Sequence, residues 1–98
     1  MFKFSLSVRT YHNARRYGLP NYEEWATIPA EDMRGYCFRA AESVRINHRG
    51  KKTAIELYRA AGLGVHTIAR LMSAEGVSLD RIRSQCEWYD KQLHESLA

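Results

Sequence analysis

Residues 52–93 decide the fold of this chain; they read KTAIELYRAAGLGVHTIARLMSAEGVSLDRIRSQCEWYDKQL. Residues 53–61 are a run of good helix formers, and Gly62 follows, a residue that readily takes the left-handed conformation found after helices. The pattern predicts a second short helix over 65–74, closed by Gly76. The segment therefore predicts a helix, a turn, a short helix, a second turn and a long third helix.

The third helix is expected to begin after Ser78, which can cap it, and to carry an apolar seam. The members of the seam recur at alternating steps of three and four residues, the spacing of a heptad pattern. They are Leu79, Ile82, Cys86, Tyr89 and Leu93. In a folded monomer this seam is expected to pack on Met33, Cys37 and Val44 of an earlier helix. From Trp88 onward the helix is expected to project past the core, where Trp88 and Leu93 would contact a second copy in a weak homodimer.

The first half of the chain predicts further helices. Residues 1–8 alternate between apolar and polar side chains, but a lone strand would have no pairing partner. We therefore expect a short extended start, followed by a helix over 6–17 that Ser5 caps and Gly18 ends. Pro20 breaks the chain, and Asn21 is expected to cap a short helix over 22–26.

A second long helix is expected over residues 27–47, with Pro29 in its first turn, where the missing N–H costs nothing. An apolar stripe should face inward along it: Met33, Cys37, Ala40, Ala41 and Val44. The chain as a whole therefore predicts one all-α domain over residues 1–98. We expect a small bundle of four or five helices with a helix-turn-helix-like C-terminal half.

Composition limits the function. A chain of 98 residues can bury one modest core but hardly a deep enzyme cleft as well. No apolar run approaches the roughly 20 residues of a membrane span, so a cytoplasmic protein is expected. Cys37 and Cys86 are expected on apolar helix faces as small buried side chains, and the four histidines lack the close spacing of a zinc site. We expect no metal and no cofactor.

The recognised catalytic patterns are missing from the sequence. It contains no GxSxG, no HExxH, no P-loop and no Gly-rich phosphate cradle. The acidic pairs at 23–24 and 31–32 stand where helices are expected to begin, and favourable interaction with the helix dipole explains them. The sequence therefore predicts a binding protein with no catalytic residues.

The positive charge is concentrated in the first 53 residues, which hold ten of the 15 Lys and Arg and five of the 11 acids. If residues 9–16 and 45–52 meet in the fold, their cations form one basic patch. Such a patch, with Tyr11 and Tyr17 between the cations, could hold a nucleic-acid backbone. A solvated face is the alternative. The cations of the predicted patch are Arg9, His12, Arg15, Arg16, Arg45, His48, Arg49, Lys51 and Lys52.

Residues 53–86 resemble the helix-turn-helix unit of DNA-binding proteins. The resemblance rests on Ile68-Ala69-Arg70-Leu71-Met72, then Gly76-Val77-Ser78, then Ile82. Ala69 and Gly76 are seven residues apart, which implies a longer turn than the commonest form has. The resemblance implies that Arg81, Arg83 and Gln85 lie on a recognition helix that reads base edges. The same glycines also fit an antiparallel bundle in which they only end helices.

Two functions follow from these patterns. The first is DNA binding by the helix-turn-helix-like unit together with the basic patch. The alternative is a protein-binding module or inhibitor, of the kind found in phages and mobile elements, that docks on a larger host protein of nucleic-acid metabolism. For that alternative, four aromatic residues are expected to be exposed anchors. They are Tyr11, Tyr22, Trp25 and Trp88.

Overall fold

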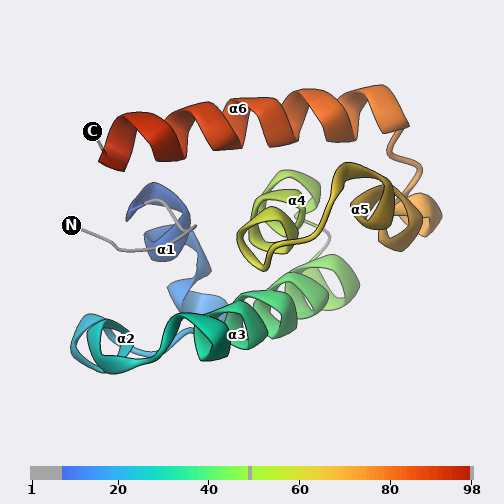
Figure 1. The fold of residues 1–98 in the computed structure, drawn as a ribbon. Coiled ribbons are helices and arrows are strands. Elements are labelled where there is room, and N and C mark those ends of the chain that lie inside the picture. The colour runs from blue at the N-terminus through green and yellow to red at the C-terminus, as the bar shows by residue number, and fades with distance from the viewer. Residues whose placement is uncertain (1–7, 49, 98) are drawn as a thin grey trace.

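The computed structural model describes the backbone of residues 8–48 and 50–97 and the side chains of 10–48 and 50–94. Within these ranges the chain forms six α-helices and no strand, which confirms the all-α prediction with one helix more than expected (Figure 1). The predicted extended start and the Ser5 cap lie outside the described residues. The α-helices are α1 Val8–Ala14, α2 Tyr22–Thr27, α3 Ala30–Ser43, α4 Lys51–Ala60, α5 Val65–Leu71 and α6 Leu79–Leu97. Three short turns join them: η1 Arg15–Tyr17, η2 Val44–His48 and η3 Ser73–Glu75.

Helix α4 is the centre of the molecule. It packs against α1, α3, α5 and α6, and in Figure 1 it is seen almost end-on between α6 on one side and α3 on the other. Most of its side chains are buried for that reason: Ala54, Ile55, Glu56, Leu57, Tyr58 and Ala60. A helix this short has little stability of its own in water, so its neighbours on all sides stabilise it.

The seam of α6 packs inside the monomer, but on other partners than predicted. Ile82, Cys86 and Tyr89 are buried, and α6 rests on α4 and α5. The expected packing on α3 is wrong, because α4 lies between the two helices (Figure 1). Trp88 and Leu93 also pack partly against the core, so the expectation that the helix projects past the core from Trp88 is wrong as well.

A buried polar cluster joins three helices across this core. The carboxylate of Glu56 in α4 accepts hydrogen bonds from Thr10 Oγ1 of α1 at 3.2 Å and from Gln85 Nε2 of α6 at 3.0 Å. Glu56 is only 4% exposed, and a buried carboxylate requires such donors. The cluster therefore specifies how α1 and α6 are placed on α4.

The predicted helix ends follow local chemistry. Asn21 Oδ1 accepts a hydrogen bond from the Glu24 amide at 2.9 Å, and Ser78 Oγ accepts one from the Arg81 amide at 3.2 Å, so both caps are confirmed. Gly76 closes the second predicted helix with φ +73°, a conformation that side chains with a Cβ rarely adopt. That segment is α5 followed by η3, so its last turn is tighter than a regular α-helix.

The second long helix differs from its prediction at both ends. Its start is at Ala30, because Pro29 is the N-cap and forces Ile28 into an extended conformation, ψ 133°. The predicted inward stripe from Met33 to Val44 is buried at every position, which confirms it. At Val44 the helix widens into the π turn η2, which the sequence did not predict.

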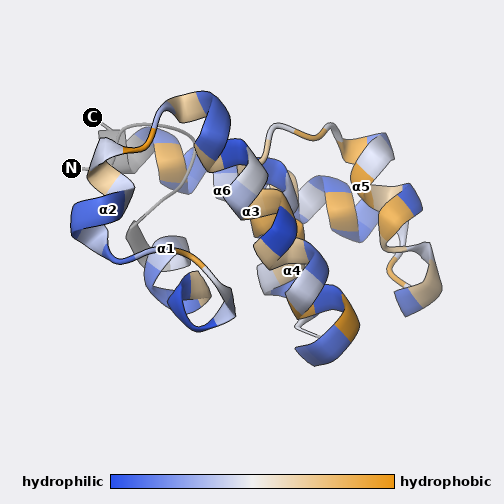
Figure 2. Ribbon diagram, turned by 90° about the horizontal axis from the view of Figure 1, so that it is seen from below, coloured by the Kyte–Doolittle hydropathy of each residue, from blue (hydrophilic) through white to orange (hydrophobic). Residues whose placement is uncertain are grey.

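The helices are amphipathic and belong to a single packed core. In Figure 2, hydrophilic and hydrophobic residues alternate along α3, α4 and α5, as expected for helices with one buried face. None of the helices in the described part of the chain combines the length and apolar character that crossing a bilayer requires.

Candidate nucleic-acid interface

The structure brings together cations from two distant parts of the sequence. The ring of Tyr17, at the end of η1, lies 4.7 Å from the ring of His48 at the end of η2, measured between centroids. The Arg16 guanidinium carbon lies 5.9 Å from the centroid of the Tyr17 ring. We call the resulting face the basic surface; it comprises Arg16, Tyr17, Arg45, His48, Lys51 and Lys52.

The π turn η2 shapes this surface. Val44 is fully buried and holds the start of the turn in the core, while Ile46 is 60% exposed and His48 is exposed at its end. A Cβ added to Gly50 would lie 3.0 Å from Val44 Cγ1, tighter than most Cβ contacts, so glycine allows the chain to return closely toward α4 without displacing Val44. π turns are rare and occur frequently at functional sites, which makes this turn a candidate on structural grounds alone.

Arg45 holds the turn in place. Its Nε donates to the Tyr58 hydroxyl at 2.9 Å, and its Nη2 donates to both carboxylate oxygens of Glu42 at 3.2 Å. Its Nη1 lies 3.9 Å from Glu75 Oε1 in η3. The pKa of Arg45 is raised, chiefly by its hydrogen bond to Tyr58. Arg45 was expected to hold phosphate, but its charge is shared with two carboxylates, so its main role here is to join four elements.

Tyr58 is the buried member of that network. Its hydroxyl donates to Glu42 Oε1 while accepting from Arg45, and burial raises its pKa to about 12. We expect Tyr58→Phe to lower the free energy of unfolding by about 1–3 kcal/mol, because both partners lose a hydrogen bond in a partly buried place. Urea denaturation measures this change.

Tyr17→Phe is the matched control for that substitution. It removes the same oxygen from a ring whose contact with His48 does not need it, so we expect a change within about 0.5 kcal/mol. Equal losses for the two variants would contradict the role of the Tyr58 hydroxyl.

The lysines of the basic surface differ in their surroundings. Lys51 and Lys52 are both exposed in the first turn of α4. The Nζ of Lys52 lies 4.6 Å from the Trp88 ring centroid, a cation–π distance that orders the side chain. No ion pair to Lys51 is present among the described residues, so its charge is available to a ligand.

The predicted reading residues of α6 are placed differently from one another. Arg81 is exposed, and Arg83 is also exposed but lies 3.6 Å from Asp80 in an ion pair. Gln85 donates from Nε2 to Glu56 at 3.0 Å, so its amide nitrogen is engaged with α4 and is not directed at a base in this structure. Gln85 lies three residues after Ile82 of the seam. The direction of its side chain depends on the Glu56 carboxylate, whose place near α6 cannot be predicted from sequence patterns.

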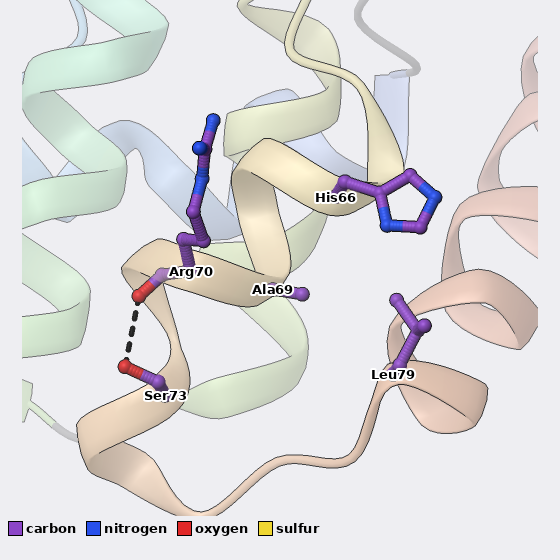
Figure 3. A pocket seen from close by; sticks show the side chains of 5 residues that line it. All are labelled: His66, Ala69, Arg70, Ser73 and Leu79. Atoms are coloured by element: carbon purple, nitrogen blue, oxygen red, sulfur yellow. Dashed lines mark hydrogen bonds between the residues drawn. The ribbon is translucent and has the colours of Figure 1, made fainter.

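A groove runs between α5 and the start of α6. Its volume is about 480 Å³, and Figure 3 shows His66 of α5 and Leu79 of α6 on opposite sides of it, with Ala69 between them. Arg70 extends away from the groove, and its carbonyl accepts a hydrogen bond from the Ser73 hydroxyl at 2.9 Å (Figure 3). Helices α5 and α6 pack against each other, and Ile68 of α5 and Ile82 of α6 are both fully buried.

Two of the four predicted aromatic anchors are core residues. Tyr11 and Trp25 are 2% and 1% exposed, so the prediction that they are exposed anchors is wrong. Their rings contact each other at 5.6 Å, and the Tyr11 hydroxyl donates to the Pro20 carbonyl at 2.7 Å. Tyr22 is half exposed, whereas Trp88 is partly covered.

The other cations predicted for the basic patch lie in or near α1, or outside the described residues. Arg15 donates to the Leu19 carbonyl at 2.9 Å and so helps close the turn after η1, although its side chain is exposed. His12 is exposed on α1, with its ring 5.6 Å from that of Tyr11. Arg9 lies in α1, but its side chain, like the whole of Arg49, falls outside the described residues.

The charges are separated along the molecule. Four exposed acids occupy the first turns of α2 and α3: Glu23, Glu24, Glu31 and Asp32. The part of the basic surface formed by η2 and the start of α4 begins where α3 ends, and α5 and the start of α6 lie toward that same end, whereas η1 with Arg16 and Tyr17 lies nearer to α2 (Figure 1). Four acids of the C-terminal half have partners inside the protein, namely Glu56, Glu75, Asp80 with Arg83 at 3.6 Å, and Asp90 with Arg59 at 2.8 Å. These acids therefore oppose an approaching polyanion less than their number in the sequence suggests.

Comparisons of the chain with protein families, with curated proteins and with solved structures found no match. Among the side chains that the structure describes, no three His, Cys, Asp or Glu residues gather as metal ligands would. The geometry of the basic surface is therefore the basis for assigning a function.

Proposed function

We propose that the protein binds nucleic acid, with the basic surface holding the phosphate backbone and the exposed residues of α5 and the start of α6 lying beside it. The observation that supports this most directly is the contact between Tyr17 and His48, which joins cations of η1 to those of η2 and α4. Phosphate contacts supply most of the sequence-independent affinity for nucleic acids. Aromatic rings among such cations provide stacking platforms.

The separation of charge supports the same proposal. The exposed acids of α2 and the start of α3 repel a polyanion from that end of α3, while the cations of η2 and the start of α4 attract it to the other end. The burial of Tyr11 and Trp25 removes two of the anchors on which docking to a larger protein depended. We therefore propose nucleic-acid binding alone.

Salt-dependent binding tests the proposal. Fluorescence anisotropy with a labelled duplex and a labelled single strand of equal length, between about 50 and 200 mM salt, gives the slope of log K against log salt. We expect Lys51→Ala to weaken binding to every sequence and to flatten the slope by about one unit, because one phosphate contact is lost. Arg81→Ala is expected instead to reduce sequence preference in the duplex.

Arg34→Ala is the matched control. Arg34 is an exposed arginine in the first half of α3, and its side chain lies beside Gly62, at the far end of α4 from Lys51. Its removal changes the net charge equally but should leave affinity and slope nearly unchanged. Failure of the wild-type protein to bind either strand form at the lowest salt, or equal effects of the Lys51 and Arg34 substitutions, would overturn the proposal.

A further inference from the structure

A second pocket opens within the basic surface, where η3 approaches η2 and the start of α4. Its volume is about 590 Å³, within the range of small-ligand pockets. The pocket is lined by Arg45, Ile46, Lys51, Ala74 and Glu75. It therefore combines a cation available to a ligand, an arginine held in place, two apolar side chains and a carboxylate.

The carboxylate of Glu75 is the unusual member of this pocket. Its Oε1 is fully shielded, yet no described residue donates a hydrogen bond to it. The nearest cation, Arg45 Nη1, lies 3.9 Å away, beyond hydrogen-bond distance. Shielded acceptors without donors are costly, and nearly all in folded proteins are satisfied. The last torsion of a glutamate is broad, so the carboxylate can rotate to present an oxygen to a donor in the pocket that Glu75 lines.

The other lining residues restrict the kind of ligand that can carry this donor. Lys51 offers a cation at the rim, which suits a phosphate. Ile46 is 60% exposed, and Ala74 is exposed beside it, so the pocket presents apolar surface to a flat ring. A cationic peptide side chain would satisfy Glu75, but Lys51, which has no ion pair among the described residues, would repel it. A ligand with N–H donors, a flat face and a negative charge fits all of these residues.

We propose that this pocket takes an unpaired guanine of a bound nucleic-acid strand, with its phosphate at Lys51 and its Watson–Crick edge at Glu75. Guanine is the common base that presents two adjacent N–H donors on that edge, N1–H and N2–H, and a carboxylate offers two acceptor oxygens. Splayed bases in single strands and loops are recognised on this edge. The inference rests on the proposed binding of nucleic acid at the basic surface.

Probes that change one functional group of the base test which atoms of guanine the pocket recognises. The probes are twelve-residue oligothymidylates with one central guanine, inosine, 7-deazaguanine or adenine, and affinity is measured by anisotropy. Guanine and 7-deazaguanine, which share the same Watson–Crick edge, should bind about tenfold more tightly than adenine. Inosine lacks the N2 amino group and should lose most of that preference.

Protein variants connect the preference to Glu75. Glu75→Gln replaces one acceptor with a donor, so it should abolish the guanine preference while binding to plain oligothymidylate stays the same or strengthens. Glu87→Gln, an exposed charge-matched control on α6, should keep the preference. Ile46→Ala should lower affinity for the guanine probe several-fold, and its side chain is too exposed to affect folding.

The outcomes separate this inference from the proposed function. Equal affinity for all four probes, or a guanine preference that survives in Glu75→Gln, overturns the guanine site. Binding of duplex DNA alone overturns it as well. In each of these cases the sensitivity of binding to Lys51→Ala and to salt still decides separately whether the basic surface binds nucleic acid.

Discussion

Ile82→Asp is expected to unfold the protein at room temperature. The Ile82 side chain is fully buried where α6 meets α4 and α5, and a carboxylate there would have neither water nor a partner cation. The loss of apolar contacts and the burial of a charge together cost more than about 4 kcal/mol. Small domains have about 5–15 kcal/mol of stability in total, so little or none would remain.

Circular dichroism during heating measures this effect, and the neighbouring residue supplies the control. Arg81→Asp introduces the same carboxylate one position earlier, on the exposed side of α6, and near the N-terminus of the helix, where negative charge is favourable. It should unfold at nearly the wild-type temperature. A cooperative transition in Ile82→Asp close to that of Arg81→Asp would show that the seam of α6 is not core.

Alkaline pH is expected to destabilise the protein through Cys37. Burial raises the pKa of this thiol from 9.0 to about 12, so the folded protein keeps its proton where the unfolded chain has lost it. The contribution to stability is therefore complete below pH 9 and is lost as the pH rises from 9 to about 12. Each unit in that window costs up to about 1.4 kcal/mol, or about 4 kcal/mol over the whole window.

Thermal unfolding at pH 8, 9, 10 and 11 with a reductant present checks this expectation. Cys37→Ala removes the thiol, so its midpoint should be slightly lower at pH 8 but should fall less steeply above pH 9. Tyr58, whose pKa is also about 12, remains in both proteins and contributes equally to each. Parallel pH profiles for the two proteins would exclude Cys37 as the titrating group.

Features set by neighbouring residues could be predicted from the sequence. Asn21 and Ser78 cap helices by bonding to amides three residues away, and Gly76 provides a conformation that its neighbours do not favour. The inward stripe of α3 follows from helical spacing in the same way. In each case the physical cause lies within one or two helical turns of the residue.

Features that depend on packing between distant segments could not be predicted. An apolar stripe does not specify its partner: the seam of α6 alone predicts packing on α3 equally well, although α4 lies between the two helices. Tyr11 and Trp25 carry both apolar rings and polar atoms, which suit a core as well as an interface. The same limit applies to the pocket at Glu75, because its walls come from η2, η3 and the start of α4, which meet only after folding.

The central place of α4 also determines how the molecule loses its structure. Helices α1 and α3, which precede α4 in the sequence, and helices α5 and α6, which follow it, all pack on α4. If either pair of helices unfolds, α4 loses part of its packing, and the other pair loses the helix on which it packs. Backbone amides of α4 should exchange with solvent hydrogen only when the whole domain opens, whereas those of the peripheral α2 can exchange through local fraying.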